Sequence, residues 1–84
     1  MSYKNELVQL SSLPVGNQGI IIDLINKGDN RRRFLDLGLT PNTVVKVERL
    51  SPSGNPIAYK IRGTVLALRK DDASKIIVNV IHRR

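Results

Sequence analysis

The chain has 84 residues, with 14 lysines and arginines against seven acidic residues, so its formal net charge is +7. It has no cysteine and one histidine, which excludes a disulfide framework, a thiolate metal site and a cysteine nucleophile. No apolar run is long enough to span a bilayer, and the first residues lack the features of a signal peptide. We therefore expect residues 1–84 to form one small, soluble, cytosolic domain without enzymatic activity.

The opening of the chain predicts a short helical turn. Leu7, Leu10 and Leu13 recur at intervals of three, which would direct Leu10 and Leu13 towards the body of the domain. Residues 1–9 carry little other pattern, and we expect them to be a poorly defined extension of the domain.

A short helix is predicted at residues 31–37, preceded by two candidate N-cap residues, Asp29 and Asn30. Its buried side is expected to consist of Phe34, Leu35 and Leu37. A glycine that ends a helix adopts a positive φ and is followed by a residue that makes an apolar contact. Gly38 and Leu39 fit these two roles.

Most of the remaining chain alternates in the manner of β-strands, at residues 19–25, 43–50, 57–62, 64–69 and 76–81. In the first of these strands Ile20, Ile22 and Leu24 would share one face. Gly63, between the third and fourth strands, suggests a bend or bulge that helps to close a barrel. The connections are too short for a parallel sheet, so we predict a small five-stranded SH3-like barrel with a short helix between strands one and two.

Several glycines and prolines are interpreted first as backbone requirements of turns and second as a rigid, exposed rim for binding. These structural residues are Gly38, Pro41, Pro52, Gly54, Pro56 and Gly63. Residues 71–75 predict one further helical turn.

The densest basic cluster is Arg31, Arg32 and Arg33, which would lie in the first turn of the predicted helix and oppose its dipole. One interpretation is docking to an acidic protein surface or to anionic lipid headgroups. The other is a solvated helix face on which one arginine covers part of the core with its aliphatic stem. Leu39, if partly exposed, would serve as an apolar anchor beside the arginines.

Metal binding and catalysis have little support in the sequence. The seven acidic residues are scattered, and a hard-cation site needs several oxygen ligands that converge. Asp71 and Asp72 are the only adjacent pair, and we expect them to cap the helical turn before Ala73. His82 lies close to the end of the chain, away from any candidate serine nucleophile. We predict no catalytic residue, no functional metal site and no cofactor.

The stretch at residues 33–41, RFLDLGLTP, resembles the FeoA family, the small cytoplasmic component of bacterial ferrous iron uptake. Further matching stretches follow the same order along the chain: LSSLPVG at 10–16, PSGNPI at 52–57, RG at 62–63, LALR at 66–69, Ala73, and IIV at 76–78. Asn42 stands where the family usually has glycine, and Asn55 where its central turn usually has aspartate. Asparagine tolerates a positive φ, so we expect the backbone to be kept at Asn42.

The resemblance implies an SH3-like domain that acts beside the membrane permease FeoB, whose cytoplasmic part includes a G-protein domain. It implies an accessory or regulatory role without catalysis, at the inner face of the membrane through that partner. In this interpretation Arg31, Arg32, Arg33 and Leu39 form part of the partner surface. Whether the chain activates, inhibits or assembles its partner stays open, as does its oligomeric state.

The alternative is a small basic β-barrel that binds nucleic acid. Residues 43–84 carry +6 of the net charge of +7. However, the only aromatic residues are Tyr3, Phe34 and Tyr59, and Phe34 is expected to be buried, so a stacking platform is lacking. We therefore favour a protein partner.

Overall fold

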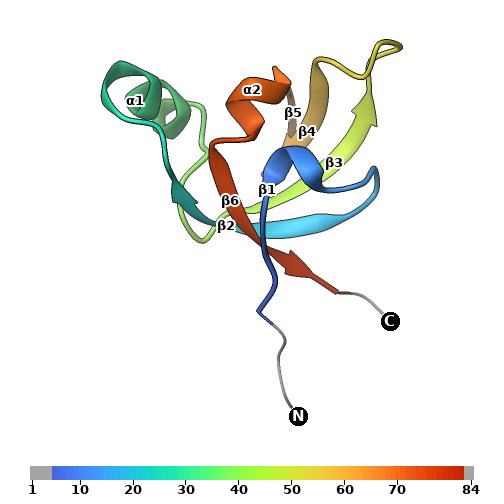
Figure 1. Cartoon of the computed structure of the whole chain (residues 1–84), viewed down its shortest axis with the longest axis horizontal. Helices are drawn as coiled ribbons and strands as arrows, with labels where there is room; N and C mark the ends of the chain where they lie inside the picture. The colour runs from blue at the N-terminus through green and yellow to red at the C-terminus, as the bar shows by residue number, and fades with distance from the viewer. Residues whose placement is uncertain (1–4, 83–84) are drawn as a thin grey trace.

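The computed structural model describes residues 5–82 and is mainly β, as predicted. The elements are β1 (Leu7–Gln9), η1 (Leu10–Ser12), β2 (Gln18–Leu24), α1 (Gly28–Asp36), β3 (Val44–Leu50), β4 (Ile57–Ile61), β5 (Thr64–Leu68), α2 (Lys70–Ala73) and β6 (Ile76–Ile81). The strands pair antiparallel in one sheet in the order β1-β6-β2-β3-β4-β5. Figure 1 shows the curled sheet, with α1 and α2 both at its upper end. No helix within residues 5–82 is long and apolar enough to cross a membrane.

The predicted count of five strands is wrong, because part of the N-terminal extension forms a sixth. β1 pairs with β6, with Leu7 opposite Asn79. The predicted helical turn is present but shorter, as the 3₁₀ turn η1, and it buries Leu10 and Leu13 as expected. Leu7 lies outside this turn and is 57% exposed. Residues 1–4 of the predicted extension lie outside the described part of the chain.

Gly63 does not bend a strand to close a barrel. Arg62 and Gly63, with φ of 52° and 80°, form a two-residue turn that joins β4 to β5. Two successive positive φ values define the tight hairpin turn whose twist matches antiparallel strands. The chain therefore reverses at Gly63, and the hydrogen-bonded sheet stays open with β1 and β5 as its edges.

The buried face of β2 also differs from the prediction. Ile21 and Leu24 are buried, whereas Ile22 is 42% exposed and Ile20 is half-buried. The register against β6 shifts between Ile21 and Asp23. Such a bulge adds one residue to a strand and interrupts its alternation of period two, which is why Leu24 and Ile21 can both be buried three positions apart.

Alternation elsewhere predicts the core correctly. Val45 and Val47 of β3 are buried, and so are Ile57, Tyr59 and Ile61 of β4. The remaining buried apolar residues are Leu10, Leu13, Ile21, Leu24, Phe34, Leu39, Leu68, Ala73, Ile76 and Val78. The sheet packs tightly at Gly19, where a Cβ atom would lie 2.9 Å from Cγ2 of Val78. Only glycine allows this close approach of β2 to the Val78 side chain.

Helix α1 begins earlier than predicted, at Gly28, with Lys27 as its N-cap residue. Asp29 and Asn30 are therefore within its first turn, and neither caps the helix with its side chain. This start moves the arginines out of the first turn, so the predicted conflict with the helix dipole does not arise. Asp29 in the first turn interacts favourably with the dipole.

The C-terminus of α1 is the one predicted. Gly38 has a φ of 93°, and its N–H donates to the carbonyl of Leu35 at 3.0 Å. The N–H of Leu39 donates to the carbonyl of Phe34, also at 3.0 Å. These two bonds define a Schellman motif, in which the residue after the glycine makes an apolar contact with the helix. Leu39 fills this role and is fully buried.

Candidate partner-binding surface

The three consecutive arginines of α1 have different surroundings. The guanidinium of Arg31 donates to the backbone carbonyl of Leu24, at the end of β2, and lies 3.9 Å from the carboxylate of Asp23. Arg31 thus ties α1 to the strand before it. Its side chain is 41% exposed, so the carbonyl bond is only partly open to water.

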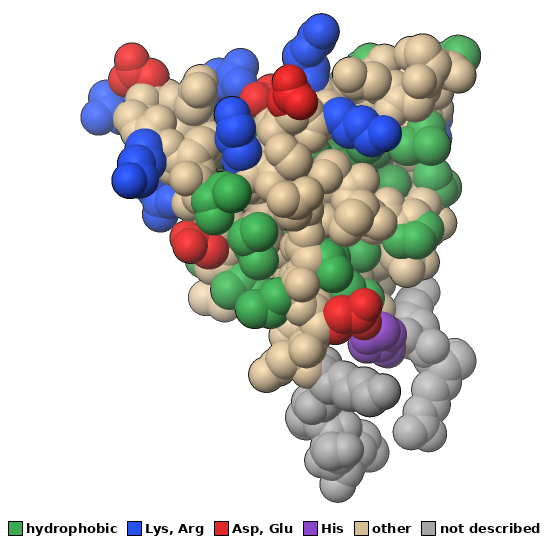
Figure 2. Space-filling view, in the orientation of Figure 1, with side chains coloured by type: hydrophobic (Ala, Val, Ile, Leu, Met, Phe, Trp, Pro, Cys, Tyr) green, Lys and Arg blue, Asp and Glu red, His purple; other side chains and the backbone are tan. Residues whose placement is uncertain are grey.

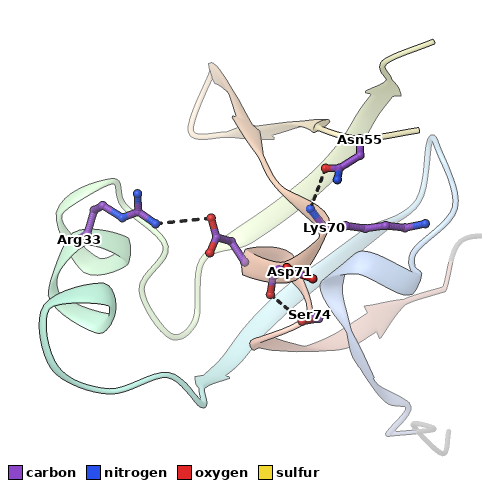
Figure 3. A network of polar contacts seen from close by, with 6 residues as sticks. Arg33, Asn55, Lys70, Asp71 and Ser74 are labelled. Atoms are coloured by element: carbon purple, nitrogen blue, oxygen red, sulfur yellow. Dashed lines mark hydrogen bonds and ion pairs between the residues drawn. The ribbon is translucent and has the colours of Figure 1, made fainter. Parts of the chain in front are cut away.

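Arg33 connects the two helices. Its guanidinium lies 3.5 Å from the carboxylate of Asp72 on α2 and 5.6 Å from the centre of the Phe34 ring. Figure 3 shows this ion pair spanning the gap between α1 and α2. A cation above an aromatic face and beside a carboxylate gains from both, although water weakens each attraction at the surface.

Arg32 is the member of the cluster that is left for a partner. It is exposed, and no ion pair or hydrogen bond holds its side chain within residues 5–82. A hollow just before α1 is lined by residues 23–28, among them Ile25 and Lys27, and by Arg31, whereas Arg32 is not part of its lining. Ile25 is 52% exposed. We call Ile25, Lys27 and Arg32 the α1 surface.

The prediction of Leu39 as an exposed anchor is wrong. Its side chain is buried because it completes the helix cap, so it is closed to a partner. Leu37, predicted to be buried, is instead 46% exposed. Ile25 is the apolar residue that sequence reasoning missed. The expected alternation, with Ile20, Ile22 and Leu24 on one face, already put Ile25 on the other face, but a single exposed isoleucine gives no signal of a binding surface in the sequence.

The predicted turn residues hold the loop between β3 and β4. Gly54 has a φ of 83°, and its N–H donates to the carbonyl of Ser51 at 2.8 Å. The side chain of Asn55 accepts a hydrogen bond from the N–H of Lys70 at 3.0 Å. This bond supplies an acceptor to the first turn of α2, as Figure 3 shows.

The expectation that Asp71 and Asp72 cap the first turn of α2 is therefore wrong. The N-cap position is Arg69, and it makes no side-chain bond. Asp72 instead pairs with Arg33, and the acceptor comes from Asn55, which lies 15 residues earlier in the chain. Asn42 has a φ of 72°, so the positive φ expected where the family has glycine is confirmed.

A second group of cations gathers on the sheet. Lys46 of β3 lies directly opposite Lys60 of β4, and Arg49 of β3 lies opposite Ala58. Lys46 alternates with the buried Val47, and the register shift between Val47 and Arg49 brings Arg49 to the same outer face, opposite Ala58. No ion pair to any of these cations occurs within residues 5–82. Like charges placed directly opposite each other destabilise a sheet, so this face is suited to an acidic partner.

The aromatic residues do not form a binding platform. Phe34 and Tyr59 are both fully buried, and Tyr3 lies outside the described residues. The Tyr59 hydroxyl has no hydrogen-bond partner within residues 5–82. Burial disfavours the charged phenolate and raises the pKa of Tyr59 to about 12.

The described residues bring no group of three or more potential metal-ligating side chains together. His82 Nε2 lies 2.8 Å from the carboxylate of Glu6 at the exposed end of β6. Three serine hydroxyls, those of Ser12, Ser53 and Ser74, donate to nearby backbone carbonyls and so support local turns.

Basic side chains also mark the helical end of the molecule. Figure 2 shows lysine and arginine side chains around α1 and α2, with apolar side chains below α1 towards β2 and β6. Basic side chains thus lie at two places on this small antiparallel sheet, around its helices and on the outer face of β3 and β4.

The FeoA domain family model matches residues 8–80, and the chain belongs to this family. It is similar to the Fe(2+) transport protein A/Fe(2+) transporter FeoB fusion protein of Porphyromonas gingivalis, with 32% identity over 88% of this chain and 9% of the relative. The chain therefore spans less than a tenth of that protein's length.

Solved structures extend the likeness. An FeoA-like protein from Clostridium acetobutylicum superimposes with a TM-score of 0.86 and 28% identity, over 98% of this chain and 94% of the other. FeoA of Stenotrophomonas maltophilia complexed with zinc, described as a procaryotic SH3 domain protein, matches in fold. Its TM-score is 0.75 at 24% identity, over 83% of this chain and 87% of the other. The predicted SH3-like class is thus confirmed, with six strands in an open sheet.

Proposed function

We propose that this chain is a non-catalytic accessory component of ferrous iron uptake that binds the cytoplasmic part of a FeoB-type permease. The observation that carries the proposal is the fused relative, in which a region like this chain and an Fe(2+) transporter share one polypeptide. Fusion keeps two domains at a high effective concentration. A separate chain of the same family needs a binding surface to reach the same proximity.

The α1 surface is the first contact that we propose. Arg32 is exposed and has no ion pair or side-chain hydrogen bond within residues 5–82, and Lys27 and Ile25 lie in the segment just before the same helix. An exposed cation near an apolar side chain suits an acidic protein surface that also buries some apolar area. Arg31 and Arg33 contribute indirectly, because their contacts with Leu24 and Asp72 hold α1 in place.

This surface also agrees with a location at the inner face of the membrane, reached through the permease. The net charge of +7 favours approach to acidic proteins and anionic headgroups.

The test is a calorimetric titration of the chain with the purified cytoplasmic part of a FeoB-type permease from the same organism. We expect saturable binding that weakens about threefold to tenfold in Arg32→Ser. Arg33→Ser removes the same charge from the next position, where it is paired with Asp72, and should weaken binding less than Arg32→Ser does. Equal affinities for Arg32→Ser and the unmodified chain would remove the α1 surface from the interface, and failure of the unmodified chain to bind would contradict the proposed function.

A further inference from the structure

The edge of the sheet formed by β5 is open. Within residues 5–82, β5 pairs only with β4 and has no strand on its other side. Val65 is 49% exposed, and Thr64 and Ala67 are also exposed. An edge strand of this kind offers unpaired backbone groups to another chain.

The hairpin register identifies which groups are available. The two-residue turn makes Ile61 and Thr64 a hydrogen-bonded pair, and such pairs alternate along an antiparallel ladder. Thr64, Leu66 and Leu68 therefore bond to β4, while the N–H and C=O groups of Val65 and Ala67 point away from it. No backbone hydrogen bond within residues 5–82 satisfies these outward groups.

This edge lacks the devices that usually protect one. Natural edge strands carry a lysine, a proline, a bulge or an inward-pointing charge that discourages pairing. β5 reads Thr-Val-Leu-Ala-Leu, without a charge or a proline, and its register with β4 is regular over all five residues. At the opposite edge β1 has only three residues. The longer of the two edges is thus the unprotected one.

The charged residues around β5 indicate what kind of chain could pair with its free edge. Arg62 precedes the strand and Arg69 and Lys70 follow it, while Lys60 lies opposite Val65 on β4. Arg62 donates to the neutral hydroxyl of Thr43 at 3.1 Å, so its charge is not compensated. None of these cations forms an ion pair within residues 5–82.

A second copy of the chain fits this edge poorly. Two β5 strands paired antiparallel about Leu66 would join Val65 to Ala67 of the other copy. That register brings Arg62 of each copy towards Arg69 and Lys70 of the other, and like charges in contact oppose association. The cations that would repel a second copy would attract an acidic partner.

We infer that the free edge of β5 is a docking site for an extended, acidic segment of the partner protein, which adds a strand beside Val65 and Ala67. This inference rests on the proposed function and names a second contact for it. Backbone hydrogen bonds to the edge supply affinity, and side-chain positions supply specificity. The small side chains of Ala58 and Ala67 lie opposite each other, so a bulky apolar side chain of the incoming strand has room over them. Acidic residues at its ends would meet Arg62 and Arg69.

The test measures binding of the permease cytoplasmic part to Val65→Pro and to its control, Val65→Thr. Proline removes the outward N–H of residue 65 and is tolerated on an edge, whereas threonine keeps the backbone and the β-branched shape. We expect Val65→Pro to bind at least tenfold more weakly and Val65→Thr to stay within threefold of the unmodified chain. Hydrogen exchange of the unmodified chain provides a readout that does not depend on the folding of a variant, and we expect the amides of Val65 and Ala67 to slow at least tenfold when the permease part is present.

Each other outcome contradicts a defined part of the inference. If the permease part binds while these two amides exchange at an unchanged rate, the edge assignment fails and the proposed function stands. If it does not bind at all, both fail. Protection of the two amides in concentrated protein alone would make a second copy the occupant, and protection by a single-stranded RNA oligonucleotide but not by the permease part would overturn the choice of a protein.

Discussion

The cations of α1 and those on the outer face of β3 and β4 differ in how many contacts they make within the chain. On α1, Arg31 bonds to the carbonyl of Leu24 and Arg33 pairs with Asp72, so two of the three arginines have contacts within the chain. On the sheet, Lys46 and Lys60 oppose each other without an acidic partner within residues 5–82. The dense cluster in the sequence is therefore mostly structural, whereas cations that are scattered in the sequence gather on one face.

This difference shows that charge density along the sequence is a poor guide to which cations stay uncompensated in the fold. A cation contributes to partner binding when its charge is uncompensated and its side chain is exposed. Strand register determines this on a sheet, because it places residues from distant segments side by side.

The largest effect on stability is expected from replacing Arg31. If that effect is absent, the distinction between Arg31, which has contacts within the fold, and the exposed Arg32 fails. Arg31→Ala removes a charged donor from the partly buried Leu24 carbonyl, and should lower the free energy of unfolding by about 1–2 kcal/mol. Arg32→Ala, at the neighbouring exposed position, should change it by less than about 0.5 kcal/mol. Urea unfolding of both variants measures the contrast, and equal changes would show that the arginines are not divided in this way.

A smaller effect is expected at the contact between the central loop and α2. Asn55→Ala leaves the N–H of Lys70 without its acceptor and should lower the free energy of unfolding by about 0.5–1 kcal/mol. Asn55→Asp restores an acceptor and adds a negative charge at the start of the helix, so it should unfold at the same or slightly higher denaturant concentration than the unmodified chain. A loss of stability in Asn55→Asp as large as that in Asn55→Ala would refute this role.

The opposed lysines Lys46 and Lys60 test whether uncompensated cations on the sheet take part in binding the partner. Lys60→Glu replaces a repulsive cross-strand pair with Lys46 by an attractive one, and should raise the free energy of unfolding by about 0.2–1 kcal/mol. The gain should shrink in high salt, because salt screens both interactions. The same variant should bind the permease part more weakly, so greater stability is expected to accompany lower affinity. A stabilised variant with unchanged affinity would mean that this face takes no part in binding.

The smallest effect at neutral pH is expected on the inner face of the same strand. Tyr59→Phe removes a buried hydroxyl that has no partner within residues 5–82, so stability at pH 7 should change by less than about 1 kcal/mol. Burial raises the pKa of Tyr59 from 10.0 to about 12, so above pH 10 the unfolded chain loses this proton first and stability falls. Tyr59→Phe should remove that contribution to the alkaline loss. Identical stability profiles of the two proteins between pH 9 and pH 12 would contradict it.

Much of the fold follows from local chemistry. Alternation on β3 and β4 locates the core, and the glycine at the end of α1 locates the helix C-terminus through its positive φ. The misassigned elements depend on tertiary contacts. β1 has three residues and is a strand because β6 lies beside it, and the bulge in β2 is fixed by the register with β6.

The candidate site was predicted less well than the fold. Residues 31–33 drew attention as a cluster, but which arginine stays available depends on Leu24, Asp23 and Asp72, which come from β2 and α2. The edge of β5 could not be predicted, because Gly63 is equally compatible with a bulge and with a hairpin turn. Only the pair of positive φ values at Arg62 and Gly63 decides between them.

The most direct test of the account is the affinity of the unmodified chain for the cytoplasmic part of its permease, measured by calorimetry at low and at high salt. The account predicts saturable binding at low salt that weakens markedly as salt is added, because uncompensated cations on α1 and on the sheet contribute to it. Absence of binding at low salt, or an affinity that salt leaves unchanged, would contradict it.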